Sequence, residues 1–147
     1  MKTIITRTIM ALICLAAFQT ALADNDKPIS VSQLPTTAQQ ILSSHFADKK
    51  VALAKVESGL IEKNYDVIFT TGEKIEFDRK GNWTEIDCKQ SSVPTKLVPT
   101  QITNYVKQNY SGNKILKIER DRNEYEIKLS NGIEITFNKN FDVIDID

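Results

Sequence analysis

The sequence contains one pattern twice, and this repeat limits the folds open to the chain. NYDVIFTTGEKIEFDRKGNW at residues 64–83 is echoed by NEYEIKLSNGIEITFNKNFDV at residues 123–143. At an offset of 60, the copies share tyrosine, glycine and aromatic positions: Tyr65 with Tyr125, Gly72 with Gly132, and Phe77 with Phe137. One copy of about 50 residues is too small to bury a substantial core alone. We therefore expect the two copies to share a core.

Each copy begins with a segment of helical periodicity. Pro35 and Pro99 stand where a helix starts, since proline is tolerated at the first turn. Apolar residues follow at helical spacing: Ala38, Ile41, Leu42 and Phe46 in the first copy, and Ile102, Tyr105, Val106 and Tyr110 in the second. The pattern predicts two amphipathic helices of about eleven residues each, one per copy.

After each helix the apolar residues alternate with polar ones, which is typical of half-buried strands. In the second copy, Asn131-Gly132 joins two alternating runs, and this dipeptide is a strong signal for a tight β-hairpin. Thr71-Gly72 stands at the same place in the first copy. Each copy is therefore predicted to hold about four strands. Four extra residues near 58–62 indicate a longer first hairpin loop in the first copy.

The predicted fold class is α+β, with tandem α-β-β-β-β repeats whose two helices pack on one face of an antiparallel sheet. Residues 34–147 would form a single domain with repeats at 34–88 and 97–147, joined by a polar linker. The other sheet face would be open and lined by polar side chains. The pattern leaves open whether the repeats share one sheet or form two packed sheets.

The N-terminal region has the features of a secretory signal peptide. Lys2 and Arg7 precede a short apolar run, and Ala21-Leu22-Ala23 is a small-x-small cleavage site. We predict cleavage after Ala23, a loose polar leader at 24–33, and a periplasmic or secreted protein without further membrane insertion. A lipoprotein signal at Cys14 is the alternative, but large apolar residues rather than small ones precede this cysteine.

Charge and cysteine content narrow the range of partners. Removing Lys2 and Arg7 from 19 basic residues leaves 17 against 19 acidic ones, a net charge of −2. The charges are interspersed, without the basic stripe that nucleic-acid binding requires. Cys88 is the only cysteine outside the signal peptide. It is either a free thiol or half of an intermolecular disulfide. The sequence is therefore compatible with a monomer and with a dimer.

No catalytic or metal-binding set is evident in the sequence. His45 is the only histidine and lies beside the apolar stripe of the first helix, where a hydrogen-bonded structural histidine is expected. Asp145 and Asp147 share a strand face and are either a solvated edge or a calcium-bridging pair, although the calcium-loop pattern is absent. We expect no enzyme activity, no cofactor and no bound metal.

The repeat resembles the PepSY-like periplasmic proteins. The resemblance rests on a signal peptide followed by two copies of Pro, amphipathic helix, Tyr-x-Val/Ile-x-Phe/Leu, x-Gly and Ile-x-Phe-Asp/Asn, with Gly-Asn-Trp in the first copy. It covers residues 34–147, and Phe141 and Val143 depart from it where the first copy has Gly81 and Trp83. It implies the fold of the beta-lactamase-inhibitor proteins, which bind through a concave sheet face and a loop. Related modules are associated with inhibiting or chaperoning secreted peptidases.

The functional prediction is a non-enzymatic exported module that binds a protein or peptide partner. Its surface would be the open sheet face and the loops at 57–63 and 79–82, and the resemblance adds inhibition of an exported enzyme as a narrower hypothesis. The predicted partner-binding residues are Asp66, Ile68, Lys74, Glu76, Trp83, Glu126, Lys128 and Glu134. Trp83 is either a binding anchor or a core residue. The alternative function is small-molecule or metal-ion binding or sensing.

Overall fold

The computed structural model describes residues 25–147. The predicted signal peptide, its cleavage site after Ala23 and the alternative lipidation site at Cys14 lie outside these residues. The helices are α1 (Thr36–His45) and α2 (Thr100–Asn109), and short 3₁₀ turns occupy η1 (Val31–Gln33) and η2 (Thr95–Leu97). The strands are β1 (Asp26–Ile29), β2 (Val51–Ser58), β3 (Lys63–Phe69), β4 (Lys74–Phe77), β5 (Trp83–Asp87), β6 (Ile115–Arg120), β7 (Glu124–Leu129), β8 (Glu134–Asn138) and β9 (Val143–Ile146).

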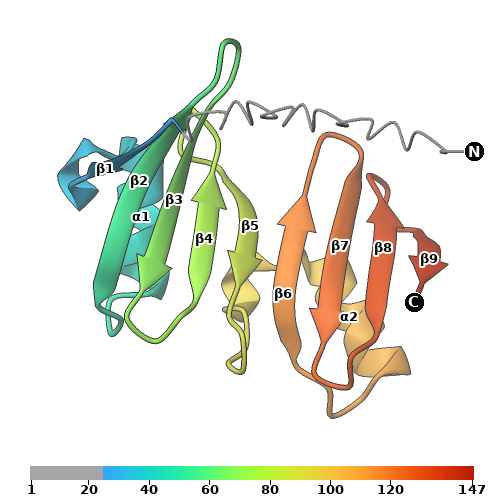
Figure 1. Cartoon of the computed structure of the whole chain (residues 1–147). Coiled ribbons are helices and arrows are strands. Elements are labelled where there is room, and N and C mark those ends of the chain that lie inside the picture. The colour runs from blue at the N-terminus through green and yellow to red at the C-terminus, as the bar shows by residue number, and fades with distance from the viewer. Residues whose placement is uncertain (1–24) are drawn as a thin grey trace, which may run out of the picture.

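The nine strands form one antiparallel sheet in which each strand pairs with its neighbours in the chain. Both helices lie on the same side of this sheet, and no helix within residues 25–147 covers the opposite face (Figure 1). The predicted α+β class is confirmed. The sheet is a meander, so the loops after β2, β4, β6 and β8 lie together at one end of it (Figure 1).

The two halves of the chain share one sheet because β5 pairs with β6, with Ile86 opposite Ile118. This pairing decides between the two arrangements that the sequence left open. The segment between the halves is not simply polar, because Val93 is buried and its N–H donates to the Ile115 carbonyl oxygen at 2.8 Å. The connection therefore packs against the sheet that it joins.

The expectation of a loose leader is wrong for residues 26–33. Asp26–Ile29 pair with β2 as an edge strand, and η1 follows directly. The segment gave little strand signal because it is short and contains Pro28, and proline is tolerated in a sheet only at an edge. The ion pair between Lys55 and Asp26 ties β1 to the open face.

A single apolar core fills the space between sheet and helices. Strand residues Phe77, Phe137 and Ile127 are fully buried, and the helices contribute Ala38 and Ile102. Aromatic rings link the helical layer to the sheet: Phe46 stacks on Phe69 with centroids 5.4 Å apart, and Tyr105 meets Phe137 edge-on at 5.4 Å. The alternation seen in the sequence thus corresponds to a covered and an uncovered sheet face.

The turn after β4 contacts the start of α1. Gly81 has a φ of +85°, and a Cβ at this position would lie 2.8 Å from the backbone nitrogen of Ala38. Only glycine fits there, because the turn needs a left-handed residue and the helix leaves no space for a side chain. In the second half, Phe141 takes the same place with a φ of 66° and stacks on Tyr125.

Candidate functional site

The open face carries a line of carboxylates, which we call the acidic row: Asp66, Glu76, Glu85, Glu119 and Glu126. Each member lies directly opposite the next on the neighbouring strand, so the row crosses β3 to β7 without a break. Like charges at directly opposed positions repel each other. The row also crosses from the first repeat to the second at Glu85 and Glu119.

Lysines beside the acidic row neutralise much of its charge. Lys74 Nζ lies 3.3 Å from Asp66 Oδ2 and also pairs with Glu76. Lys117 Nζ lies 3.3 Å from Glu85 Oε2 and 2.7 Å from Glu119 Oε2. These contacts mean that many charges of the open face are already satisfied within the protein.

The lysines do not fully neutralise the acidic row at its centre, Glu85, or at its far end, Glu126. Burial raises the pKa of Glu85, and the nearby Glu76 and Glu119 raise it further against the lowering effect of Lys117. Burial likewise raises the pKa of Glu126, with Glu119 adding to the shift. Ionised Glu85 and Glu126 therefore destabilise the folded state.

Glu85→Gln is expected to raise the free energy of unfolding at pH 7 by about 0.5 kcal/mol, the scale of one cross-strand repulsion. Because the folded-state pKa of Glu85 is raised, the folded state is favoured when Glu85 is protonated. This stabilisation is fully present below the pKa of Glu85 in the unfolded chain and is lost as the pH rises through its pKa in the folded protein. The gain should therefore vanish in acid. Glu124→Gln, whose cross-strand partner is Asn138, is the control. Urea denaturation gives the free energy of unfolding of both variants. An equal change in the two would contradict the proposed repulsion at Glu85.

The hairpin between β2 and β3 projects beyond the end of the sheet (Figure 1). Its tip carries Leu60 and Ile61, whose relative exposures are 106 % and 92 %. Adjacent large aliphatic side chains without cover expose apolar area to water, which is unfavourable for an isolated protein. The corresponding hairpin of the second repeat, between β6 and β7, is shorter and lacks such a pair.

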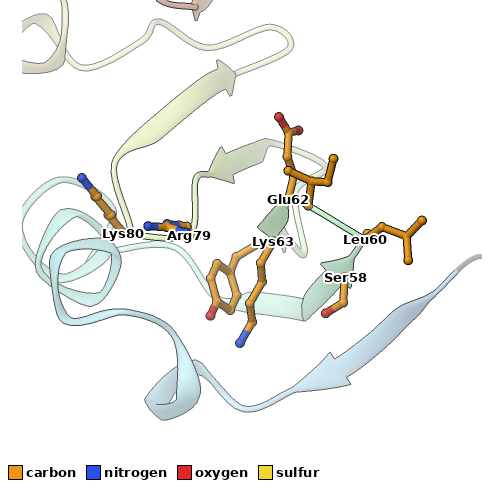
Figure 2. Close-up of a pocket in the computed structure, with 9 residues that line it drawn as sticks. Ser58, Leu60, Glu62, Lys63, Arg79 and Lys80 are labelled. Carbon is orange, nitrogen blue, oxygen red and sulfur yellow. The ribbon is translucent and has the colours of Figure 1, made fainter.

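A cleft with a volume of about 1020 Å³ lies between this hairpin and the two loops beside it. Its lining joins residues from the two loops predicted to bind a partner, including Ile61 and Arg79, with residues after β6 such as Arg122. Arg79 and Lys80 also line a smaller pocket together with residues 58–63 of the hairpin, including Leu60 (Figure 2). The predicted loops thus form one continuous surface, which we call the hairpin end.

Trp83 and Arg120 form the floor of the cleft. The Arg120 guanidinium carbon lies 4.0 Å from the centre of the Trp83 ring, and Arg120 Nε donates to the Trp83 carbonyl oxygen at 2.7 Å. The indole is only 5 % exposed. Stacking and the hydrogen bond hold the guanidinium in one orientation, so its position in the cleft is set before any ligand binds.

Most predicted site residues lie on one face of the sheet, in two groups separated by β5 and β6. Seven are in the strands that form the open face: Asp66, Ile68, Lys74, Glu76, Glu126, Lys128 and Glu134. Trp83 is not an open-face residue, because a bulge opposite Phe77 turns it toward the core side. Of the two roles that the sequence left open for Trp83, its burial agrees with the core residue, and the ring supports Arg120. Arg120 and Arg122 were missed, although their charges next to a turn were visible in the sequence.

Three other candidates take structural positions. Cys88 is 2 % exposed and burial raises the pKa of its thiol to about 11, which opposes reaction with a second chain. His45 closes α1 in its last turn. Asp145 lies opposite Thr136 near the sheet edge. Within residues 25–147 there is no group of three or more histidine, cysteine or carboxylate side chains arranged to hold a metal ion.

No helix in the described part of the chain is long and apolar enough to cross a membrane. No curated protein matches the chain significantly.

Solved structures of similar sequence share this fold. A "putative periplasmic protein" of the DUF2874 family from Bacteroides vulgatus is 59 % identical, with a TM-score of 0.83, and the match covers 85 % of this chain and 98 % of that one. A "putative calcium-regulated periplasmic protein" from Bacteroides thetaiotaomicron is 57 % identical over the same shares, with a TM-score of 0.82. A third, from Bacteroides vulgatus and of unknown function, is 40 % identical over 83 % and 98 %, with a TM-score of 0.78.

The family model described as "Putative beta-lactamase-inhibitor-like, PepSY-like" matches residues 63–145, which is more than half of the chain. This match extends from β3 into β9, so it includes β3–β5 of the first half, α2 and the strands of the second half, but not α1 or β2. It agrees with the sheet, the helices on one face and the relatives of known structure. The chain therefore belongs to the PepSY-like, beta-lactamase-inhibitor-like family.

Proposed function

We propose that the protein is a non-enzymatic exported module that binds a protein partner through the hairpin end, with the neighbouring open face as a secondary contact. Inhibition of an exported enzyme is the narrower form of this proposal. The observation that carries it is the adjacent pair Leu60 and Ile61, fully exposed on a projecting hairpin. A projecting apolar tip can insert into a recess of a partner, as anchor residues of interfaces do.

The charges of the open face and of the hairpin end support the hairpin end as the main contact and the open face as the secondary one. On the open face, the predicted site residues pair with each other: Lys74 with Glu76, and Lys128 with Glu134 at 2.6 Å. Paired surface charges must exchange partners to bind another protein, and this lowers their net contribution. The apolar tip has no such competing contacts, so it is the better source of binding energy.

The test is affinity capture from the envelope of the producing bacterium, with the purified protein as bait. Replacing the tip with serine (Leu60→Ser and Ile61→Ser together) should weaken binding of the captured partner at least about tenfold, since anchors of this kind contribute about 2 kcal/mol. Unfolding stability should change by less than about 0.5 kcal/mol, because both side chains are exposed in the free protein.

The matched control is Ile144→Ser. Ile144 is an exposed aliphatic residue on β9, at the opposite edge of the sheet, with a relative exposure of 51 %. This variant should bind as the unaltered protein does. Capture that persists at full strength after the double replacement, or that falls equally with the control, would show that the tip is not the anchor.

Inhibition has its own readout once a partner is known. If the captured partner is an exported enzyme, the unaltered protein should lower its rate, and the tip variant should do so only at about tenfold higher concentration, following the loss of affinity. If the enzyme keeps its full rate at a saturating concentration of the unaltered protein, the protein binds this partner but does not inhibit it.

Metal binding or sensing is the alternative, and one relative is described as calcium-regulated. Calcium prefers six to eight oxygen ligands. In the described residues, the densest carboxylate array is the acidic row, and Lys74 and Lys117 already occupy contact positions along it. The acidic row therefore does not fit a calcium site, and we do not extend the proposal to a metal.

A further inference from the structure

The cleft at the hairpin end is bordered by five basic side chains, which we call the basic rim: Lys63, Arg79, Lys80, Arg120 and Arg122. They come from three segments of the chain, the base of the β2–β3 hairpin, the turn after β4 and the end of β6 with its loop. Three acidic residues also line the cleft: Glu62, Asp78 and Asp121. Basic side chains therefore outnumber acidic ones by five to three.

The basic rim differs from the open face in its pairing. All nine ion pairs among residues 25–147 involve Lys49, Lys55, Lys74, Lys89, Lys117 or Lys128. No member of the basic rim takes part in any of these pairs, although carboxylates line the same cleft. Its positive charges remain available to a ligand.

Two of the carboxylates in the cleft are held by their own turns. Asp78 accepts from the backbone N–H groups of Lys80 and Asn82, at 2.8 and 2.9 Å, and from the Asn82 side chain. Asp121 accepts from the N–H groups of Asn123 and Glu124, at 2.7 and 2.9 Å. The third, Glu62, points away from Lys63 (Figure 2). Burial opposes the ionisation of Asp78, but its hydrogen bonds with Asn82 and Lys80 and the charge of Arg120 lower its pKa. These acids stabilise the loops, and none of the ion pairs of the described residues joins them to the basic rim.

The rim is also preorganised. Arg120 is fixed on the Trp83 ring, with its Nε used by the Trp83 carbonyl. Lys63 Nζ lies over the Tyr65 ring, 5.4 Å from its centre. The guanidinium Nη groups of Arg120 form no hydrogen bond within the described residues. A guanidinium held in this way is suited to bind a carboxylate through two parallel hydrogen bonds.

We infer that the cleft binds carboxylates of an acidic, extended segment of the partner while Leu60 and Ile61 insert beside it. The cleft is far larger than a single small anion needs, and it adjoins the apolar tip through Ile61. A segment that carries aspartate or glutamate next to an apolar recess would match both features. This inference rests on the proposed function and specifies the chemistry of the partner.

Trp83 gives a direct readout, because it is the only tryptophan in the chain and lies under Arg120. Titration of the full protein with an oligoglutamate peptide should change the indole fluorescence saturably, whereas an oligoglutamine peptide of equal length should not. The variant with both Arg79→Ser and Arg122→Ser should bind oligoglutamate at least about fivefold more weakly, the effect of two exposed charge contacts.

The charge-matched control carries Lys96→Ser and Lys107→Ser, which remove two unpaired cations on η2 and α2, away from the cleft. It should bind oligoglutamate as the unaltered protein does. Equal weakening by both variants, or no saturable signal with oligoglutamate, would overturn the inference. A signal with inorganic phosphate that oligoglutamate cannot displace would also overturn it and indicate a small-anion site.

The two proposals can fail separately. If envelope capture is lost in the Leu60 and Ile61 variant but unchanged in the Arg79 and Arg122 variant, the binding function stands and the acidic-segment inference is wrong. If the peptide titration succeeds but capture is insensitive to the tip, the cleft binds carboxylates and the tip is not the anchor.

Discussion

Gly81→Ala is expected to lower the free energy of unfolding by about 2–5 kcal/mol. Two effects add. A left-handed backbone conformation disfavours alanine by about 1–2 kcal/mol, and forcing a methyl group into filled space adds about 1–3 kcal/mol. The added Cβ would lie 2.8 Å from both the Ala38 nitrogen and the Pro35 Cβ. The backbone of α1 cannot move aside as a flexible side chain would, so either the turn or the helix start must shift.

Gly132→Ala separates the two effects. Gly132 has a φ of +91° and no atom within 4 Å of an added Cβ, so only the backbone term of about 1–2 kcal/mol applies. Urea denaturation of both variants gives the difference, which measures the contact between the β4–β5 turn and α1. Equal losses would mean that α1 does not lie against this turn. Because the turn carries Arg79 and Lys80, Gly81→Ala should also disturb the cleft.

Lys49→Met is expected to lower the free energy of unfolding by about 2–3 kcal/mol at pH 7. Its partner Glu73 is 5 % exposed, and Lys49 Nζ donates to Glu73 Oε1 at 2.6 Å. Burial alone would raise the pKa of Glu73, but hydrogen bonds from Lys49 and Thr71 outweigh it and lower the pKa to about 2. Removal of Lys49 leaves a buried carboxylate with too few donors.

A second substitution shows whether the pair or the position matters. Ile133 occupies the place of Glu73 in the second repeat, so Glu73→Ile has a precedent within the chain. Lys49→Met combined with Glu73→Ile should recover most of the stability lost in Lys49→Met alone, because no unpaired charge remains. Guanidinium chloride denaturation provides the values. Additive losses in the double variant would contradict this account of the pair.

The pH dependence has a defined sign. Since the folded-state pKa of Glu73 lies below its ordinary value, the pair stabilises the protein above the unfolded pKa, and this contribution is lost as the pH falls toward 2. The defect of Lys49→Met should therefore shrink in acid, where the carboxyl group is neutral in both proteins.

Local patterns were sufficient to predict most of the fold. Alternation places Phe77 and Phe137 on the covered face, and Asn131-Gly132 lies in the turn between β7 and β8. Of these two residues only Gly132 has a positive φ, so the turn is not the type I′ turn that the dipeptide favours. What could not be predicted depends on contacts between distant segments. The joining of the halves through Ile86 and Ile118 is one such contact, and either of the two sheet arrangements would satisfy the same alternation.

The candidate site was less accessible to sequence reasoning for the same reason. The acidic row exists only because the register of five strands brings its carboxylates into line, and a shift of one residue would scatter them. Trp83 and Arg120 are 37 residues apart and meet only through the pairing of β5 with β6. By contrast, the exposed tip at 58–62 follows directly from the four extra residues of the first repeat.

The most direct test of the proposed function is photo-crosslinking from the hairpin tip in living cells. A photoreactive amino acid replaces Leu60 in one variant and Ile144 in another. Both side chains are exposed, but Leu60 lies between the second and third strands and Ile144 on the last strand of the sheet. A binding module anchored at the hairpin end should give one dominant crosslinked exported protein from position 60 and none of that product from position 144. The absence of any specific product from position 60, or identical products from both positions, would contradict it.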